Sequence, residues 1–262
     1  MIRAPLPIAP PIALLLTALL CACSVSDEQA EPASLTVLSY NIKRGLGNDG
    51  VTDITRAAEL INRLAPDLVA LQEIDHGVER SGSIEQMTVL AELTGMHARF
   101  ASFMPYQGGE YGIGVLSRFP ILETRRYDLP PGPEPRVALE VRVQLPDGEE
   151  LIFCDVHFYN TREERLAQAE VVLERLAERE HPVILAGDFN SLPGGGVMQF
   201  VMTDFTNARK GEDRLTFSAT EPDREIDYVL YRPAEAFRVE SVRVLDESVI
   251  SDHRPVLVVL AR

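Results

Sequence analysis

The sequence contains no tryptophan and only two lysines, Lys43 and Lys210. It has no long run of basic residues, and its formal net charge is −15. Tight, non-specific binding to DNA or RNA depends on clustered Lys and Arg side chains that neutralise phosphates. The composition therefore argues against a protein of that kind, although it leaves open a small phosphorylated ligand held by a metal ion.

Cysteine is also scarce. Cys21 and Cys23 lie near the N-terminus, and Cys154 lies in the apolar run "LIFCDVHF". If the N-terminus is processed, Cys154 is the only thiol left besides a lipidated Cys23, so no internal disulfide can form. Its apolar surroundings predict that Cys154 is a buried, small hydrophobic side chain.

The N-terminal residues resemble an export signal. The mostly apolar stretch 8–20 is too short to span a bilayer comfortably. The following "LCAC" resembles a bacterial lipoprotein processing site, which would place a lipid on Cys23; ordinary secretion with cleavage nearby is the alternative. We expect a signal peptide over 1–23, a polar tether over 24–34 and a single domain over 35–262. The protein would then be exported, as a cell-envelope lipoprotein on the periplasmic or outer face or as a secreted soluble protein.

The remaining chain is long enough, and apolar enough at 45% hydrophobic residues, for one large α/β domain. Apolar runs predict strands at 35–42, 67–74, 97–103, 111–117, 121–128, 136–145, 150–158, 181–190, 225–231, 237–245 and 255–261. Helical spacing predicts helices at 53–64, at 84–94 and after a capping-box pattern formed by Thr161 and Glu164. Residues 193–196 read as a Gly-rich loop. Many strands with helices between some of them favour two packed sheets with helices outside.

Polar side chains recur at the ends of these strands. They are Asn41, Glu73, His157, Asp188, Asn190, Asp227, Asp252 and His253. Ligands in layered α/β folds collect at strand ends, where rigid strands lead into adaptable loops. Each residue alone has an ordinary explanation: an Asn or Asp can form a turn, and Asp227 could pair with Arg224 or Arg232. Together, the oxygen-rich set suits Mg²⁺ or Ca²⁺, and the absence of paired Cys or closely spaced His argues against zinc.

Seven short segments, taken in order, resemble the endonuclease/exonuclease/phosphatase superfamily. They are "SYNI", "LQE", "YGIGVLSR", "DVH", "GDFN", "IDYVL" and "SDHRPV". The superfamily includes deoxyribonuclease I, exonuclease III-type enzymes, inositol polyphosphate 5-phosphatases and neutral sphingomyelinases. The resemblance spans nearly the whole chain from Leu35. It implies a four-layer α/β sandwich, with two packed central β-sheets flanked by helices, and metal-dependent hydrolysis of a phosphate ester.

The resemblance also implies a metal site. Glu73 matches the principal ligand, and Asn41 and Asp252 match positions beside the metal. We expect Mg²⁺, with Mn²⁺ or Ca²⁺ as alternatives. An ion at Glu73 would neutralise the charge that makes phosphate esters resist attack.

Five residues match catalytic positions of the superfamily. Asp188 and Asn190 match the pair that orients water and the phosphoryl group. His253 matches the histidine at the scissile phosphate, and Asp227 matches its carboxylate partner. His157 matches a second histidine of the deoxyribonuclease and sphingomyelinase branches. Either His253 or Asp188 could be the general base.

Three further residues are candidates for substrate contacts. The segment around Arg80 resembles a branch related to fungal GPI-anchor lipid-remodelling proteins and their bacterial relatives, in which Arg80 would lie near the substrate; otherwise it is a solvated loop arginine. Tyr111 and Arg136 could contact phosphate. Alternatively, Tyr111 only packs in its strand and Arg136 is a surface charge.

These observations predict a divalent-metal-dependent phosphoesterase, acting on phosphodiesters or phosphomonoesters outside the cytoplasm. A phospholipid headgroup or small phosphorylated compound is the expected substrate, nucleic acid is less favoured, and we expect a monomer. One alternative is a secreted, Mg²⁺-dependent nuclease, because secreted deoxyribonucleases can be acidic too. Another is a non-catalytic binding module on the same fold, although such proteins usually lose a ligand or a histidine that is retained here.

Overall fold

The structure, a computed structural model, describes residues 1–2, 34–209 and 211–262. Cys23 and residues 24–33 of the expected tether lie outside the described residues. From residue 34 onward the described residues belong to one compact unit. No helix in the described part of the chain has the length and apolar character needed to cross a membrane.

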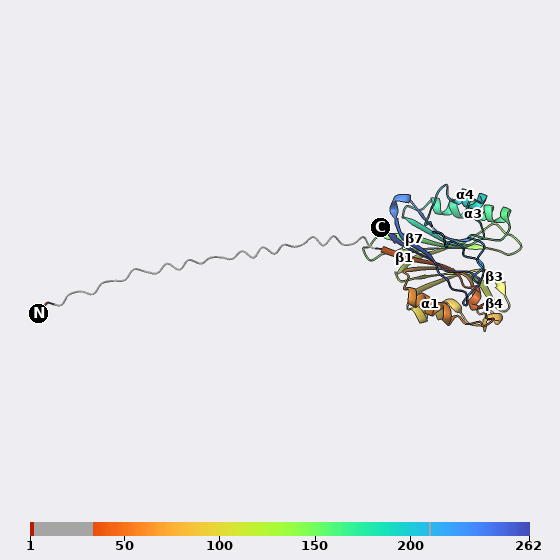
Figure 1. Ribbon diagram of the computed structural model, residues 1–262, viewed down its shortest axis with the longest axis horizontal. Coiled ribbons are helices and arrows are strands. Elements are labelled where there is room, and N and C mark those ends of the chain that lie inside the picture. The colour runs from red at the N-terminus through yellow and green to blue at the C-terminus, as the bar shows by residue number, and fades with distance from the viewer. Residues whose placement is uncertain (3–33, 210) are drawn as a thin grey trace. The chain divides into compact units, whose positions relative to one another are not determined.

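Two six-stranded sheets pack face to face between two layers of helices (Figure 1). The first sheet has the order β11-β12-β1-β2-β4-β3. Its strands are β1 (Ser34–Asn41), β2 (Leu68–His76), β3 (His97–Tyr106), β4 (Gly109–Ser117), β11 (Arg238–Val244) and β12 (Val256–Ala261). β1 and β2 are parallel, and the other neighbours are antiparallel.

The second sheet has the order β5-β6-β7-β8-β10-β9. Its strands are β5 (Ile121–Asp128), β6 (Val137–Gln144), β7 (Glu150–His157), β8 (Val183–Asp188), β9 (Thr206–Asn207) and β10 (Asp227–Arg232). Only the pair β7 and β8 is parallel. The predicted four-layer sandwich is confirmed.

Helices cover the outer face of each sheet. Apolar residues of α1 (Thr55–Leu64) and α2 (Gln86–Thr94) pack against the first sheet, and those of α3 (Arg162–Ala177) and α4 (Gly196–Val201) pack against the second. Short 3₁₀ turns lie at η1 (Lys43–Gly45), η2 (Glu79–Ser81) and η3 (Ala234–Ala236). The structure begins α4 at Gly196, where the predicted Gly-rich loop ends. With only six residues, α4 is too short to show a helical period.

Two local predictions have different outcomes. Cys154 is fully buried beneath α3, as predicted for a small hydrophobic side chain. The capping box at the start of α3 is wrong in detail, because neither side chain caps a backbone N–H. Instead, the Thr161 hydroxyl donates a hydrogen bond to the Glu164 carboxylate. The two side chains therefore hydrogen-bond to each other and leave the backbone N–H groups at the start of α3 without a side-chain cap.

The core between the sheets leads directly to the polar residues. Because side chains alternate along a strand, Phe153, Asp155 and His157 of β7 share the face that points at the first sheet. Phe153 belongs to the apolar core between the sheets, and His157 ends the strand. The inner face therefore changes from apolar to polar at the end of β7, where the candidate site lies.

Candidate active site

Three predicted site residues form one row across the second sheet. His157 of β7 lies opposite Asp188 of β8, which lies opposite Asp227 of β10. All three are almost fully buried. Opposed residues on neighbouring strands have Cβ atoms about 5 Å apart, so the row holds an imidazole beside two carboxylates. His157 Nε2 is 3.4 Å from Asp188 Oδ2.

The first sheet contributes Asn41 and Glu73. Asn41 ends β1, and its Nδ2 lies 3.2 Å from Glu73 Oε1 and 3.3 Å from Asp188 Oδ2. Its Oδ1 accepts a hydrogen bond from the backbone N–H of Lys43, which fixes the orientation of the amide. Asn41 therefore connects the acid of the first sheet to the row of the second.

Glu73 owes its position to a β-bulge in β2. Gln72 lies opposite Ile113 of β4 and Ile74 lies opposite Gly112, so Glu73 is an extra residue with φ of 59°. Positive φ is unfavourable for a residue with a Cβ, and such strain collects at functional sites. The side chain of Gln72 points into the space between the two sheets, so in a regular strand the next residue, Glu73, would point to the opposite face. The bulge releases it from that alternation.

His253 and Asp227 form a hydrogen-bonded pair. His253 Nδ1 lies 3.1 Å and 3.2 Å from the two carboxylate oxygens of Asp227. Its Nε2 lies 3.5 Å from Asn41 Nδ2 and 3.7 Å from Asp188 Oδ2. The ring of Phe217 packs against the imidazole, with centroids 4.9 Å apart. His253 therefore faces the row with one nitrogen while Asp227 holds the other.

The alternative partners predicted for Asp227 are engaged elsewhere. Arg224 pairs with Asp223, and Arg232 pairs with Asp204. The pairing of Asp227 with either arginine is therefore wrong.

Asp252 and Asn190 lie at the edges of this arrangement. Asp252 forms an ion pair with Lys43 Nζ at 2.7 Å. Asn190 has φ of 48°, and its backbone N–H donates to Asp188 Oδ1 at 2.8 Å, so the turn-forming explanation for Asp188 is also correct. The side-chain nitrogen of Asn190 donates to the Phe158 carbonyl at 3.0 Å. Asn190 therefore holds the loop after β8 through its backbone N–H and one side-chain N–H.

Burial and charge separate the pKa values of this group. Burial alone would lower the pKa of His253, but the charges of Asp227 and Asp188 outweigh it and raise the pKa to about 10. Burial and the charge of Asp227 raise the pKa of Asp188 to about 7. Burial and the positive charge of Arg136 hold the pKa of His157 well below its usual value. At neutral pH, His253 is a cation, His157 is neutral, and Asp188 is close to its titration point.

Arg80 is rigidly held next to the site. Its guanidinium forms a two-point ion pair with the buried Asp75, at 2.8 Å and 2.9 Å. It also lies over the rings of Tyr106 and Tyr111, at 4.3 Å and 4.9 Å from their centroids. The solvated-loop alternative is wrong. Sequence reasoning missed Asp75, although an acid inside an apolar strand was a usable signal.

Arg136 is buried rather than exposed. Only 7% of it is accessible, and it pairs with Glu134 and lies over the ring of Phe103. Its Nε has no hydrogen-bond partner among the described residues. Tyr111 packs edge-on against Phe103, and burial and the charge of Glu73 raise its pKa. The surface-charge alternative for Arg136 is wrong, and Tyr111 both packs in its strand and lies near Glu73.

The carboxylate oxygens of Glu73 and Asp252 are suitable donors for a divalent ion, whereas Asn41 presents its amide nitrogen to Glu73 and would have to turn its amide to add an oxygen ligand. The carboxylates of Glu73 and Asp252 are partly exposed, at 22% and 27%. Each lies against a cation, Arg44 at 4.0 Å from Glu73 and Lys43 at 2.7 Å from Asp252. Both acids therefore already sit where positive charge is accommodated, and all-oxygen ligation suits Mg²⁺, Mn²⁺ or Ca²⁺.

A second group could also hold a metal. Ligand atoms of Asp188, Asp227 and His253 all lie within 4.8 Å of one another. However, Nδ1 of His253 is already hydrogen-bonded to the Asp227 carboxylate, which leaves only Nε2 of this ring for a further ligand. This group is therefore a candidate both for holding a metal and for moving protons, and the Glu73 group is the metal site that the motifs predict.

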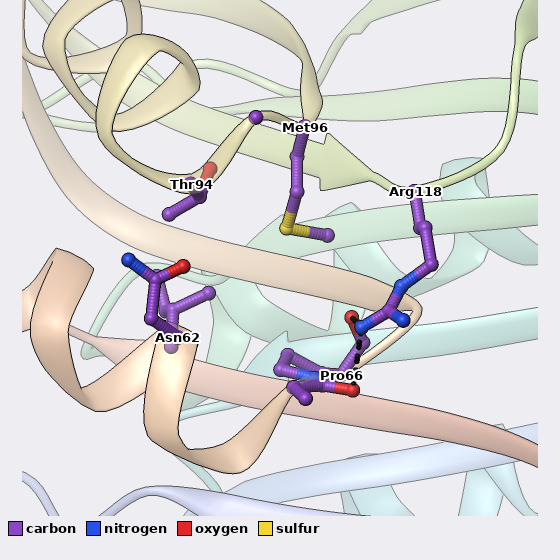
Figure 2. A pocket seen from close by; sticks show the side chains of 8 residues that line it. Asn62, Pro66, Thr94, Met96 and Arg118 are labelled. Atoms are coloured by element: carbon purple, nitrogen blue, oxygen red, sulfur yellow. Dashed lines mark hydrogen bonds between the residues drawn. The ribbon is translucent and has the colours of Figure 1, made fainter.

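A separate hollow of about 300 Å³ lies at the C-terminal ends of α1 and α2 (Figure 2). Arg118 borders it and donates hydrogen bonds to the carbonyls of Ala65 and Pro66, which closes the end of α1. No predicted site residue lines this hollow. It lies where β2 begins, whereas Glu73 lies towards the other end of that strand.

Known proteins share this fold. A model of the endonuclease/exonuclease/phosphatase family matches residues 38–253. The chain belongs to this family. Its members are hydrolases that act on phosphate ester bonds with a divalent metal ion, so the predicted superfamily and enzyme class are confirmed.

Three individual proteins that resemble this chain share no more than about a third of its residues in the matched part. A UPF0294 protein of Vibrio cholerae is 32% identical over 132 residues, which cover 47% of this chain and 44% of the relative, so the match spans less than half of that protein. An endonuclease/exonuclease/phosphatase from Beutenbergia cavernae is 25% identical with a TM-score of 0.73, over 87% of this chain and 71% of that one. The mannosyl-6-phosphatase Bt3783 of Bacteroides thetaiotaomicron is 20% identical with a TM-score of 0.70, over 87% and 100% of the two chains. That last likeness shows the fold alone.

Proposed function

We propose that this chain is a divalent-metal-dependent phosphoesterase that acts outside the cytoplasm on a small phosphorylated compound or a phospholipid headgroup. One observation carries the proposal. His253, held by Asp227 at 3.1 Å, faces the buried row of Asp188 and His157, and Asn41 joins that row to Glu73. The arrangement brings a cation, a titrating acid and a metal-ligand set to one point.

The proposed metal ligands are Glu73, Asn41 and Asp252. A bound divalent ion, with Mg²⁺ the first candidate, would neutralise phosphate charge and stabilise the leaving oxygen. Lys43 pairs with Asp252 and Arg44 lies beside Glu73, so these cations limit how much negative charge a substrate meets on approach.

We assign the general base to Asp188. A base must be unprotonated at the working pH, and a pKa near that pH is the most effective. The pKa of Asp188, about 7, meets this condition, whereas His253, with a pKa of about 10, is a cation at neutral pH. Asp188 would accept a proton from the attacking water while His253 donates hydrogen bonds to the phosphoryl oxygens.

Arg80 and Arg136 are the proposed contacts to the rest of the substrate, together with Tyr111. Aromatic rings and acidic partners hold both guanidinium groups, so little side-chain entropy is lost when a ligand binds. Fixed single cations suit a compact anion better than a polymer, which needs a track of positive charge. The name of the structurally similar mannosyl-6-phosphatase indicates that its substrate is a sugar phosphate, which is a compact anion. This supports sugar phosphates as candidate substrates of the present chain.

The proposed location rests on residues 1–34, whose pattern resembles a lipoprotein signal and tether. A lipid on Cys23 would keep the domain at an envelope membrane, and phospholipid headgroups or extracytoplasmic phosphates would be the available substrates.

A substrate panel with Mg²⁺, Mn²⁺ and Ca²⁺ tests the function. It contains bis-p-nitrophenyl phosphate, mannose 6-phosphate, inositol phosphates, phosphatidylinositol, sphingomyelin and supercoiled plasmid DNA. Asp188→Asn serves as the inactive variant, and Asp223→Asn, on an exposed loop, is the matched control. We expect hydrolysis of a small ester or lipid that is lost only in Asp188→Asn. Efficient plasmid nicking that Asp188→Asn abolishes would instead establish a nuclease.

A further inference from the structure

One polar pair crosses the apolar interior between the two sheets, directly behind the active-site row. Gln72 of β2 donates a hydrogen bond from Nε2 to Asp155 Oδ1 of β7, at 2.6 Å, and both side chains are fully inaccessible. Their surroundings are the core between the sheets, which includes Val37, Leu68, Ile113, Phe153 and Ala186. A carboxyl group placed there without a cation requires an explanation.

The pair occupies a particular place relative to the site. Asp155 precedes His157 by two residues, so both side chains share one face of β7. Gln72 lies opposite Asn41 and immediately precedes the bulge residue Glu73. The hydrogen bond therefore joins the strand that carries the metal-ligand acid to the strand that carries His157.

Two buried atoms of this pair have no hydrogen-bond partner among the described residues: Gln72 Oε1 and Asp155 Oδ2. Both are acceptors when Asp155 is ionised, so they cannot satisfy each other. A single proton on Asp155 Oδ2 would make this atom a donor, and Gln72 Oε1 would be the matching acceptor. A carboxylic acid and a carboxamide have matching planar heads, so two such hydrogen bonds can close a ring.

The strands around Asp155 supply no compensating charge. Its opposite neighbours are Leu139 on β6 and Ala186 on β8, and both are apolar. Along β7, Cys154 faces the helices, and His157 is held neutral by burial. Burial likewise raises the pKa of Asp155 well above its usual value, although the Gln72 amide and nearby backbone N–H groups act in the opposite direction.

We propose that Asp155 is a neutral carboxylic acid in the working enzyme, and that its cyclic acid–amide pair with Gln72 positions the Glu73 strand against the His157 strand. Both are positioning residues, since neither reaches the reacting atoms. The competing explanation is an ionised Asp155 with buried water on the two unpartnered atoms.

The protonation state is tested by the stability of Asp155→Asn against pH. Asparagine keeps both hydrogen bonds with Gln72 as an amide–amide pair but cannot ionise. A native-state pKa above the unfolded value makes the wild type lose stability as pH rises above about 4, because the unfolded chain releases a proton that the native state retains. We expect the ratio of unfolding constants, wild type over Asp155→Asn, to rise by up to about tenfold per pH unit from pH 4 towards pH 7.

A ratio that stays flat, or falls, across this range would overturn the neutral acid. Asp223→Asn is the exposed control and should give a flat ratio. If Asp155→Asn fails to fold, infrared spectroscopy of the Asp188→Asn variant decides the matter, because that variant lacks the other buried carboxyl group that titrates near pH 7. A protonated-carboxyl band at pH 7 that exchanges slowly in ²H₂O supports the proposal, and its absence refutes it. Neither measurement needs a substrate, so this part stands or falls independently of the proposed function.

The positioning role rests on the proposed function, and kinetics on the panel's best substrate test it. We expect Asp155→Leu and Gln72→Leu each to lower kcat by about tenfold or more, since small misplacements of reacting groups are costly. Asp155→Asn should stay within about twofold of the wild type, because it keeps the pair.

The double variant Gln72→Leu/Asp155→Leu separates positioning from mere stability. Replacing both partners by apolar groups removes the unsatisfied atoms, so the midpoint of unfolding should recover relative to the single variants. Turnover should not recover, because the link between the strands is still missing. Recovery of both quantities, or full turnover in Asp155→Leu, would reduce the pair to a packing feature. Because these measurements require an active enzyme, such a result would refute the positioning role of the pair and leave the proposed function intact.

Discussion

Replacing Asp227 by Asn tests the charge assignments of the site most directly. The substitution keeps a hydrogen-bonding group of the same shape beside His253 Nδ1 but removes the negative charge. That charge is the largest influence raising the pKa of His253, which burial alone would lower. It also raises the pKa of Asp188. One substitution should therefore lower both pKa values.

The size of the effect follows from the site. The pKa of His253 stands at about 10 against an ordinary 6.5. An opposite charge in contact contributes about 1–3 pH units, so we expect the alkaline limb of the pH–rate profile to move down by about 2 units. Each unit corresponds to about 1.4 kcal/mol of differential interaction. With that shift, protonated His253 at pH 9 becomes about tenfold scarcer.

The assay is kcat/KM against pH from 5 to 10.5, on bis-p-nitrophenyl phosphate at saturating metal. Activity should rise as Asp188 loses its proton and fall as His253 loses its own, which gives a bell-shaped profile. In Asp227→Asn both limbs should move towards acid pH. The carboxamide can also hold the wrong ring tautomer, so the absolute rate should fall, and normalised profiles are compared. Asp223→Asn provides the control.

A normalised profile whose alkaline limb stays in place would refute the reasoning. It would mean that Asp227 orients the imidazole without stabilising its charge. A shift of the alkaline limb with a fixed acid limb would retain the His253 assignment and remove Asp188 as the base.

Three further predictions concern the metal site, the His253–Asp227 pair and the N-terminus. Glu73→Gln should lower activity and metal affinity with only partial rescue by added Mg²⁺, and parental values in a metal titration would mean that the metal lies elsewhere. His253→Ala and Asp227→Ala should each lower kcat by roughly 10²-fold or more. The double variant should be little worse than the more damaged single variant, because the two residues act as a unit. Fully multiplicative losses of kcat, in variants that circular dichroism shows to be folded, would exclude such a pair. Mass spectrometry of membrane-fraction protein should find a lipid on Cys23, and a mature N-terminus elsewhere without lipid mass would contradict the envelope location.

The sequence predicted the positions of the strands along the chain closely because that information is local. Apolar runs located the strands of both sheets, within a few residues at most ends. The short α4 and the two-residue β9 were missed because neither is long enough to show a period. Short motifs also made Glu73, Asp188 and His253 candidates for the site, since a motif is readable without knowing where it lies in space.

The sequence by itself determined which chemical groups are present, their order, and the strand ends that carry them. Only the tertiary structure decided how these groups meet. The contact between Asn41 and Asp188 joins residues 147 positions apart, and the bond between Gln72 and Asp155 joins residues 83 apart. The bulge that redirects Glu73 exists only in the register between β2 and β4. Burial and neighbouring charge, which decide whether His253 is a cation or Asp155 is neutral, are properties of packed sheets, because a pKa depends on what lies within a few ångströms in space rather than along the chain.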